Sequence, residues 1–344
     1  MREPPNIPVE LLRACLRERY DLEAIALEFL PRGYDYRAGV YRVMDDRGAV
    51  YLLKVTSRPL YEPGCLVPRY LRDLGITAVV APLPTKSGAV WATLSEWTVI
   101  IYPFLEGDTS LAGMTDEQWK ETGSVFRKIH QAPLPPGGFP SLRKESFDPS
   151  EYVRWVHVFE VDQQRAQRSG SDAARALRDA WMTHRSKIEI AATSLEQLAA
   201  ALRSRALRYV ICHADVHAAN LLRDPASHVF ALDWDEVMLA PKERDFIFIR
   251  EPYAQSFWEG YGVRASDEID WMALTYFRWE RVIQDLIEEA QQALFRSDVS
   301  EEARLTAAQR FAATFAPGGN LDAVYAAAAH LPRDLGAPRR QGKG

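Results

Sequence analysis

Two short stretches decide how this sequence is interpreted: CHADVHAAN at residues 212–220 and LDWD at residues 232–235. Apolar runs at 209–212 and 229–233 predict a short strand leading into each polar segment. Asp215 then lies in a loop just past a strand, where a carboxylate can face an open site. Asn220 offers a neutral oxygen ligand and Asp233 a charged one. Hard-oxygen donors of this kind suit Mg²⁺ better than Zn²⁺.

These residue types are the ones that phosphoryl transfer uses. Metal ions neutralise charge on the phosphates, while an aspartate receives or orients the acceptor hydroxyl. Because a carboxylate is a weak base, the main task expected of Asp215 is positioning. A cation for the phosphates is expected from Lys54, which lies inside the apolar strand LLKV at 52–55. Glu62 is the acidic residue between Lys54 and Asp73, so it is the candidate partner of that lysine.

The rest of the chain predicts a small sheet-rich lobe followed by a larger helical lobe. Apolar runs at 40–44 and 49–55 flank a DDRG turn signal and predict an antiparallel hairpin. Thr115 and Gln118 fit a capping box, and helical stretches are predicted over 150–204 and 267–290. The expected fold class is α+β. Residues 1–105 would form a nucleotide-binding lobe, and residues 106–344 a helical lobe with the catalytic loop and the acceptor site.

The composition indicates an ordinary globular protein and argues against several other classes. Of 344 residues, 47% are apolar and 26% are charged, and the net charge of −5 gives no sign of a nucleic-acid-binding face. The three widely spaced cysteines show no disulfide framework, which favours a reducing compartment. Neither a signal-peptide segment nor an apolar run long enough to span a bilayer is visible. We therefore expect a cytoplasmic protein, with no nucleic acid, membrane or protein partner implied.

The segment 213–220, followed by Asp233, resembles the catalytic loop and metal-binding aspartate of aminoglycoside phosphotransferases and choline kinases. The sequence resembles spectinomycin phosphotransferases more closely, in DWDEVMLAPKERD at 233–245, FWEGYG at 257–262 and YFRWER at 276–281. With the layout of the N-terminal lobe, the resemblance covers roughly residues 5–325. It implies a bilobal protein-kinase-like fold, with a small antiparallel-sheet N-lobe and a larger helical C-lobe.

The resemblance also implies roles for individual residues. Asp215 would be the catalytic aspartate, Asn220 and Asp233 would hold Mg²⁺, and Lys54 would contact the phosphates of ATP or GTP. Glu62 would support Lys54. The purine would bind at the backbone of a hinge formed by Ile101, Tyr102, Pro103 and Phe104.

Four further residues are expected to support the catalytic loop rather than react: His213, His217, Asp235 and Asp245. The implied acceptor is a small, cationic, hydroxyl-rich molecule. Spectinomycin is the first choice, and its inactivation would follow from the charge and bulk of the added phosphate.

The sequence departs from the family in two places. Ala214 stands where the usual His-Gly-Asp triplet has glycine. The loop expected to cover the phosphates, from Gly33 to Val40, is not glycine-rich, because Gly33 and Gly39 are its only glycines. Nucleotide affinity therefore cannot be inferred from that loop.

Other interpretations of the same residues remain open. The acceptor could be choline, homoserine or an amino-sugar, and the protein could be a non-catalytic nucleotide-binding pseudokinase. His213 and His217 also have a spacing that a metallohydrolase could use, although no further histidine cluster supports it. Glu280 lies at the edge of an apolar helical stripe, where it either pairs with an arginine or faces the substrate. Glu280 and Trp279 are the acceptor-site candidates.

Overall fold

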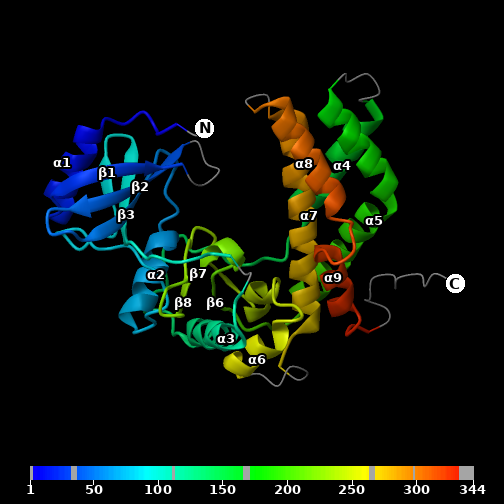
Figure 1. Ribbon diagram of the computed structural model, residues 1–344. Helices are drawn as coiled ribbons and strands as arrows, with labels where there is room; N and C mark the ends of the chain where they lie inside the picture. Colours follow the sequence, from blue (N-terminus) through cyan, green and yellow to red (C-terminus); the bar gives the residue numbers. More distant parts are fainter. Residues whose placement is uncertain are drawn as a thin grey trace. The chain divides into compact units, whose positions relative to one another are not determined.

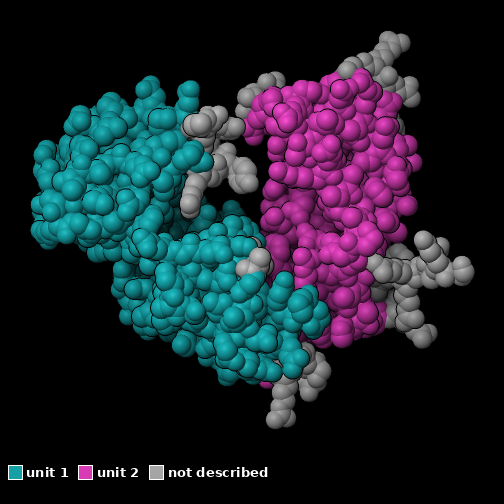
Figure 2. Space-filling model, in the orientation of Figure 1, with its two compact units in different colours: residues 1–144, 210–239, 251–264 teal, residues 145–209, 240–250, 265–344 magenta. Residues whose placement is uncertain are grey.

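The computed structural model describes residues 3–31, 37–110, 113–165, 171–262, 268–296 and 299–332. The chain forms two compact units, which Figure 2 colours separately. The first unit contains residues 1–144, 210–239 and 251–264, and the second contains residues 145–209, 240–250 and 265–344.

The first unit begins with a five-stranded antiparallel sheet in the order β1-β2-β3-β5-β4 (Figure 1). The predicted hairpin is present, because β2 and β3 pair from Ala38↔Thr56 to Met44↔Val50. Its turn is stabilised by Asp45, whose Oδ1 accepts the backbone N–H groups of Arg47 and Ala49. The strands are β1 (Ala24–Leu30), β2 (Ala38–Asp45), β3 (Val50–Thr56), β4 (Ala92–Leu94) and β5 (Trp97–Pro103).

Two helices cover opposite faces of this sheet. α1 (Val9–Tyr20) buries Leu12 and Leu16 in a core cluster with alternate residues of β3 and β5, including Leu53 and Ile101. α2 (Pro63–Asp73) instead contributes Cys65 to a second cluster that contains Ile100. Lys54 pairs with Ile100 across the two strands and therefore points to the face that α2 covers.

The remainder of the first unit contains two helices and short strands. α3 (Asp116–Gln131) has the predicted capping box, and it packs against α6 (Ala254–Tyr261) through glycines. The strands β7 (Leu221–Arg223) and β8 (Val229–Ala231) form a hairpin, preceded by β6 (Val210–Cys212) and the 3₁₀ turn η1 (Ala218–Asn220). Backbone bonds between Ala231 and residues 78 and 80 join this hairpin to the N-terminal part of the same unit.

The second unit is helical. α7 (Trp271–Phe295) packs against α4 (Ser150–Arg165), α5 (Asp172–Arg203), α8 (Glu301–Ala313) and α9 (Asn320–Ala328). The short elements β9 (Met238–Ala240) and η2 (Lys242–Phe246) complete the secondary structure of the described residues. Asp270 caps α7, since its Oδ1 accepts the N–H groups of Met272 and Ala273. Among the described residues, no helix is both long and apolar enough to cross a membrane.

The predicted fold class is confirmed, since an antiparallel sheet is combined with a helical body. The sequence predicts a helix over residues 65–74. Helix α2 begins two residues earlier, at Pro63, because proline is well suited to the first helical position. The predicted lobe boundary near residue 105 stays a prediction. Each of the two compact units combines several separate segments of the chain, so no single residue divides them. Of the loop expected over the phosphates, residues 33–36 lie outside the described residues, and Gly39 and Val40 belong to β2.

Candidate active site

The β7–β8 hairpin brings the two predicted metal ligands together. Leu221 pairs with Ala231, so Asn220 immediately precedes the hairpin and Asp233 lies two residues after it. The backbone N–H of Leu232 donates to the carbonyl of Asn220 at 2.8 Å, which continues the pairing by one step. The hairpin thus makes neighbours of two residues that are thirteen positions apart.

Asp215 is held by two side chains of its own loop. The Nδ2 amide of Asn220 donates to Asp215 Oδ2 at 3.1 Å and to the Asp215 carbonyl at 2.9 Å. His217 Nδ1 accepts the N–H of Ala219 at 3.2 Å, and its Nε2 lies 3.2 Å from Asp215 Oδ2 and 3.3 Å from Asn220 Nδ2. The predicted catalytic carboxylate is a quarter exposed and fixed in orientation. Such a group can orient a hydroxyl.

His213 is buried beneath the loop that carries Asp215, and its supporting role stays a prediction. It is 1% exposed and its ring lies 4.6 Å from that of Trp234. Its Nδ1 accepts the N–H of Asp215 at 3.3 Å, and its Nε2 therefore donates to the carbonyl of Leu232 at 2.7 Å. One imidazole ring thus connects the loop that carries Asp215 to the segment that carries Asp233.

Asn220 and Asp233 fit the requirements of a magnesium site. Because Asn220 directs its Nδ2 to Asp215, the other end of the amide, Oδ1, is the atom that can act as a ligand. Asp233 has a φ of +54° and a side chain that is 54% exposed, so its carboxylate is accessible. An amide oxygen and a carboxylate are a donor set for a hard cation and leave positions for phosphate and water.

Lys54 forms its ion pair with a residue that the sequence did not single out as its partner. Its Nζ lies 2.6 Å from Asp235 Oδ2 and 3.8 Å from Asp233 Oδ1. Burial lowers the pKa of the Lys54 ammonium, but Asp235 and Asp233 raise it, and the net direction is upward. Lys54 is therefore a cation beside the predicted metal ligands.

The predicted pairing of Lys54 with Glu62 is wrong in this structure. Glu62 is exposed at the entrance of α2, and among the described residues no ion pair joins it to Lys54. The physical reason is that Pro63 starts the helix immediately after Glu62, which leaves the glutamate outside the helix face that covers Lys54.

The hinge residues occupy the end of β5 and the chain beyond it. The carbonyl of Ile101 accepts the N–H of Leu83 at 2.7 Å, and Pro103 has no N–H. The N–H of Phe104 lies 3.4 Å from the carbonyl of Val50. Purine binding at this hinge stays a prediction.

The remaining predicted residues lie in the helical unit. Glu280 is 6% exposed and pairs with Arg244, which is the arginine pairing that the sequence left open. Trp279 is fully buried with its ring against Tyr325. Asp245 is 1% exposed in η2. Contact of the acceptor with Glu280 or Trp279, and bracing of the catalytic loop by Asp245, stay predictions.

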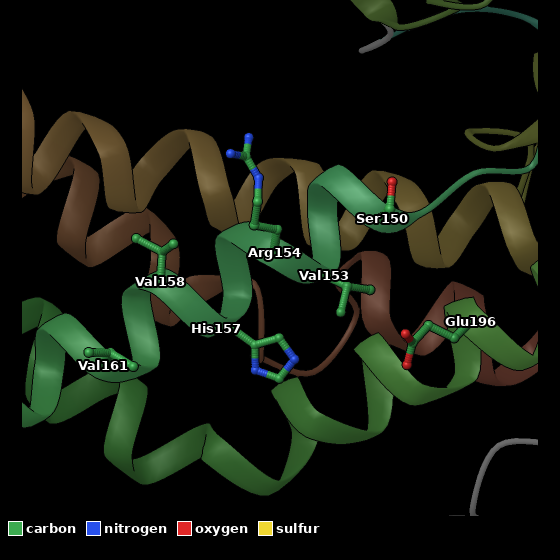
Figure 3. Close-up of a pocket in the computed structure, with 7 residues that line it drawn as sticks. All are labelled: Ser150, Val153, Arg154, His157, Val158, Val161 and Glu196. Carbon is green, nitrogen blue, oxygen red and sulfur yellow. The ribbon is translucent and has the colours of Figure 1, made fainter.

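A shallow pocket on the helical unit has different chemistry. It follows one face of α4 from Ser150 to Val161 and includes Glu196 of α5. Figure 3 shows Val153 and His157 directed towards α5, while Arg154 points away from it. Val153, Val158 and Val161 contribute apolar surface to its lining, and none of the predicted phosphotransfer residues belongs to it. We therefore do not assign the active site to this pocket.

Residues that sequence reasoning missed lie around the segment after Asp233. Arg143 donates to the carbonyl of Asp235 at 2.7 Å and pairs with Glu236 at 3.0 Å. Tyr61 donates to the carbonyl of Val237 at 2.8 Å. These contacts join residues more than 90 positions apart, so no local sequence signal could have revealed them.

The fold and the site together define a phosphotransferase. A family model described as "Phosphotransferase enzyme family" matches residues 27–272. The chain belongs to this family and is an ATP-dependent small-molecule phosphotransferase.

Similar proteins agree with that membership. In the crystal structure of spectinomycin phosphotransferase APH(9)-Ia with ADP and spectinomycin, the chain is 26% identical in sequence to this one. The two structures superpose with a TM-score of 0.82, and the match covers 95% of this chain and 100% of that chain. The AMP-bound structure of spectinomycin phosphotransferase APH(9)-Ia matches with 25% sequence identity and a TM-score of 0.76, over 92% of this chain and 98% of that chain. Protein StrN of Streptomyces griseus is 26% identical over 260 residues, which cover 71% of this chain and 76% of StrN.

Proposed function

We propose that this enzyme transfers the γ-phosphate of ATP to a hydroxyl of an aminocyclitol antibiotic, with spectinomycin as the first candidate. The observation that carries the proposal is the grouping of Asp215, Asn220, Asp233 and Lys54 in one compact unit. Likeness over the whole chain to a spectinomycin phosphotransferase supports the choice of acceptor.

Each residue has a distinct task in the proposed reaction. Lys54 binds phosphate oxygens through its ammonium group. Asp215 accepts a hydrogen bond from the acceptor hydroxyl and orients the oxygen for in-line attack. It takes the proton late, because the transition state of phosphoryl transfer is loose. His217 and Asn220 hold the carboxylate of Asp215 in place.

Asn220 and Asp233 would hold Mg²⁺, which when bound supplies positive charge to the phosphates of the nucleotide. A net charge of −5 is compatible with a cationic acceptor, although charge alone identifies none. The proposed outcome is loss of antibiotic activity, because the phosphate adds about two negative charges to a cationic ligand.

An acceptor panel tests the substrate assignment. The purified protein would be incubated with MgATP and, separately, with spectinomycin, other aminoglycosides, choline and homoserine, and the products would be analysed by mass spectrometry. We expect addition of one phosphate to spectinomycin. Phosphorylation of choline or homoserine, with spectinomycin unchanged, would retain the phosphotransferase and contradict the proposed substrate.

A further inference from the structure

We infer that Asp235 is the residue that positions Lys54 for the nucleotide phosphates, in place of an acidic residue on helix α2. The inference rests on the proposed role of Lys54 as the phosphate contact. It assigns to Asp235, 181 positions away in the chain, a task that was predicted for Glu62.

The direction of the Lys54 side chain brings its ammonium group to Asp235. The strand alternation turns Lys54 to the α2 face of the sheet, next to Ile100 and Cys65. Its side chain is only 23% exposed, so the ammonium group needs a nearby counter-charge. Asp235 supplies this charge at 2.6 Å and Asp233 lies farther away at 3.8 Å. A lysine ammonium has three donors, so one bond to Asp235 leaves two that can serve phosphate oxygens.

The first turn of α2 leaves space for the backbone of Asp235 because it contains a glycine. Gly64 is the second residue of this helix. A Cβ at Gly64 would lie 3.2 Å from the carbonyl oxygen of Trp234 and 3.4 Å from Cα of Asp235. The backbone around Asp235 therefore packs directly against the glycine, and a larger side chain would displace it.

Hydrogen bonds from Arg143 and Tyr61 fix the backbone at Asp235 and at Val237. Arg143 donates to the carbonyl of Asp235 at 2.7 Å and lies over the ring of Tyr61 at 4.2 Å. The hydroxyl of Tyr61 donates to the carbonyl of Val237. A carboxylate on a fixed backbone can hold a lysine in one orientation. The side chain of Glu62 is exposed at the start of α2 and forms no ion pair with Lys54 among the described residues.

The test measures ADP affinity by calorimetry in the presence of EDTA, so that metal binding does not contribute. Asp235→Asn is expected to weaken binding severalfold, because Lys54 loses the carboxylate that orients its ammonium group for the phosphates. Asp235→Glu keeps the carboxylate and should restore most of the affinity. Asp46→Asn removes an exposed carboxylate from the β2–β3 turn and serves as the charge-matched control, with an expected change below about twofold.

A second variant tests the packing argument without touching a charged group. Gly64→Ala should also weaken metal-free ADP binding, by less than Asp235→Asn, because it displaces the backbone that carries Asp235. Thermal unfolding of each variant verifies that it is folded. If Gly64→Ala does not fold, the comparison of the two Asp235 variants still decides the question.

Three results would separate the inference from its alternatives. Unchanged ADP affinity in Lys54→Met would refute the proposed role of Lys54 itself. A loss in Lys54→Met and Glu62→Gln, but not in Asp235→Asn, would overturn the assignment of Asp235. Unchanged metal-free affinity in Asp235→Asn, combined with a higher Mg²⁺ requirement for activity, would make Asp235 a metal ligand and also overturn it.

Discussion

Ala214 is the residue at which the catalytic loop departs from its family, and its backbone explains why glycine is usual there. Its φ is +68°, in the left-handed region that a Cβ disfavours. The residue is 5% exposed and lies between His213 and Asp215. The loop that orients the catalytic carboxylate is thus formed at a conformational cost of about 1 kcal/mol.

Ala214→Gly should raise the free energy of unfolding by about 0.5–1 kcal/mol, because glycine adopts a positive φ without strain. Urea denaturation measures the change. Ala219→Gly, in the neighbouring 3₁₀ turn, is the control and should lower stability by a similar amount. A loss of stability in Ala214→Gly would show that the buried methyl group contributes more through packing than its backbone costs.

The grouping of Asp215, Asn220 and Asp233 could be predicted from the sequence because their relation is local. Asp215 and Asn220 lie in one loop, and a short hairpin carries the chain from Asn220 to Asp233. The partner of Lys54 could not be predicted, since Asp235 reaches it only through the tertiary fold. Similarly, the buried contact between Glu280 and Arg244 links two elements whose packing no periodicity reveals.

At the scale of elements, the crossing of α3 and α6 depends on two glycines. A Cβ at Gly123 would overlap the carbonyl oxygen of Phe257, and a Cβ at Gly260 would overlap that of Lys120. The backbones are therefore in direct contact. The stretch FWEGYG thus includes a packing residue, Gly260, and Tyr261 adds a 2.8 Å bond to His130.

Gly123→Ala and Gly260→Ala should each lower the free energy of unfolding by about 2–4 kcal/mol, because the helices must separate to admit a methyl group. Chemical denaturation gives the value. Ala254→Gly, at the first position of α6, is a control that should cost only about 0.5–1 kcal/mol. Neutral effects at both glycines would contradict the close approach of the two backbones.

The elements themselves were largely predictable. The hairpin of β2 and β3, the capping box of α3 and the long helices follow from local patterns of apolar residues and turn signals. The glycine-mediated contact of α3 and α6 was not predicted, since a glycine in a helix carries no signal for its neighbour.

At the scale of the whole molecule, the buried carboxyl group of Glu243 predicts how the free energy of unfolding varies with pH. Glu243 is 3% exposed and its Oε1 accepts the N–H of Asp270 at the start of α7. Burial raises the pKa of Glu243, and the bond from Asp270 opposes this only in part. The folded state therefore holds a proton on Glu243 at a pH where the unfolded state has released it. The resulting stabilisation is fully present below the pKa that Glu243 has in the unfolded chain. It is lost as the pH rises through the higher pKa that Glu243 has in the folded protein.

Glu243→Gln should remove this pH dependence. Relative to the wild type, the variant should gain stability as the pH rises from about 4.5 to 7, because glutamine cannot ionise. Urea denaturation at a series of pH values measures the difference, with Glu96→Gln in the exposed β4–β5 turn as control. A constant difference across this range would show that Glu243 titrates alike in both states.

The central claim is that Asp215 directs phosphate to an acceptor hydroxyl, and its most direct test is acceptor-dependent ADP release. The purified enzyme would be assayed with MgATP, with and without spectinomycin, beside Asp215→Asn. We predict release that requires spectinomycin and falls at least about a hundredfold in the variant, since the amide cannot accept the proton. Equal spectinomycin-dependent release by the variant and the wild type would contradict the account.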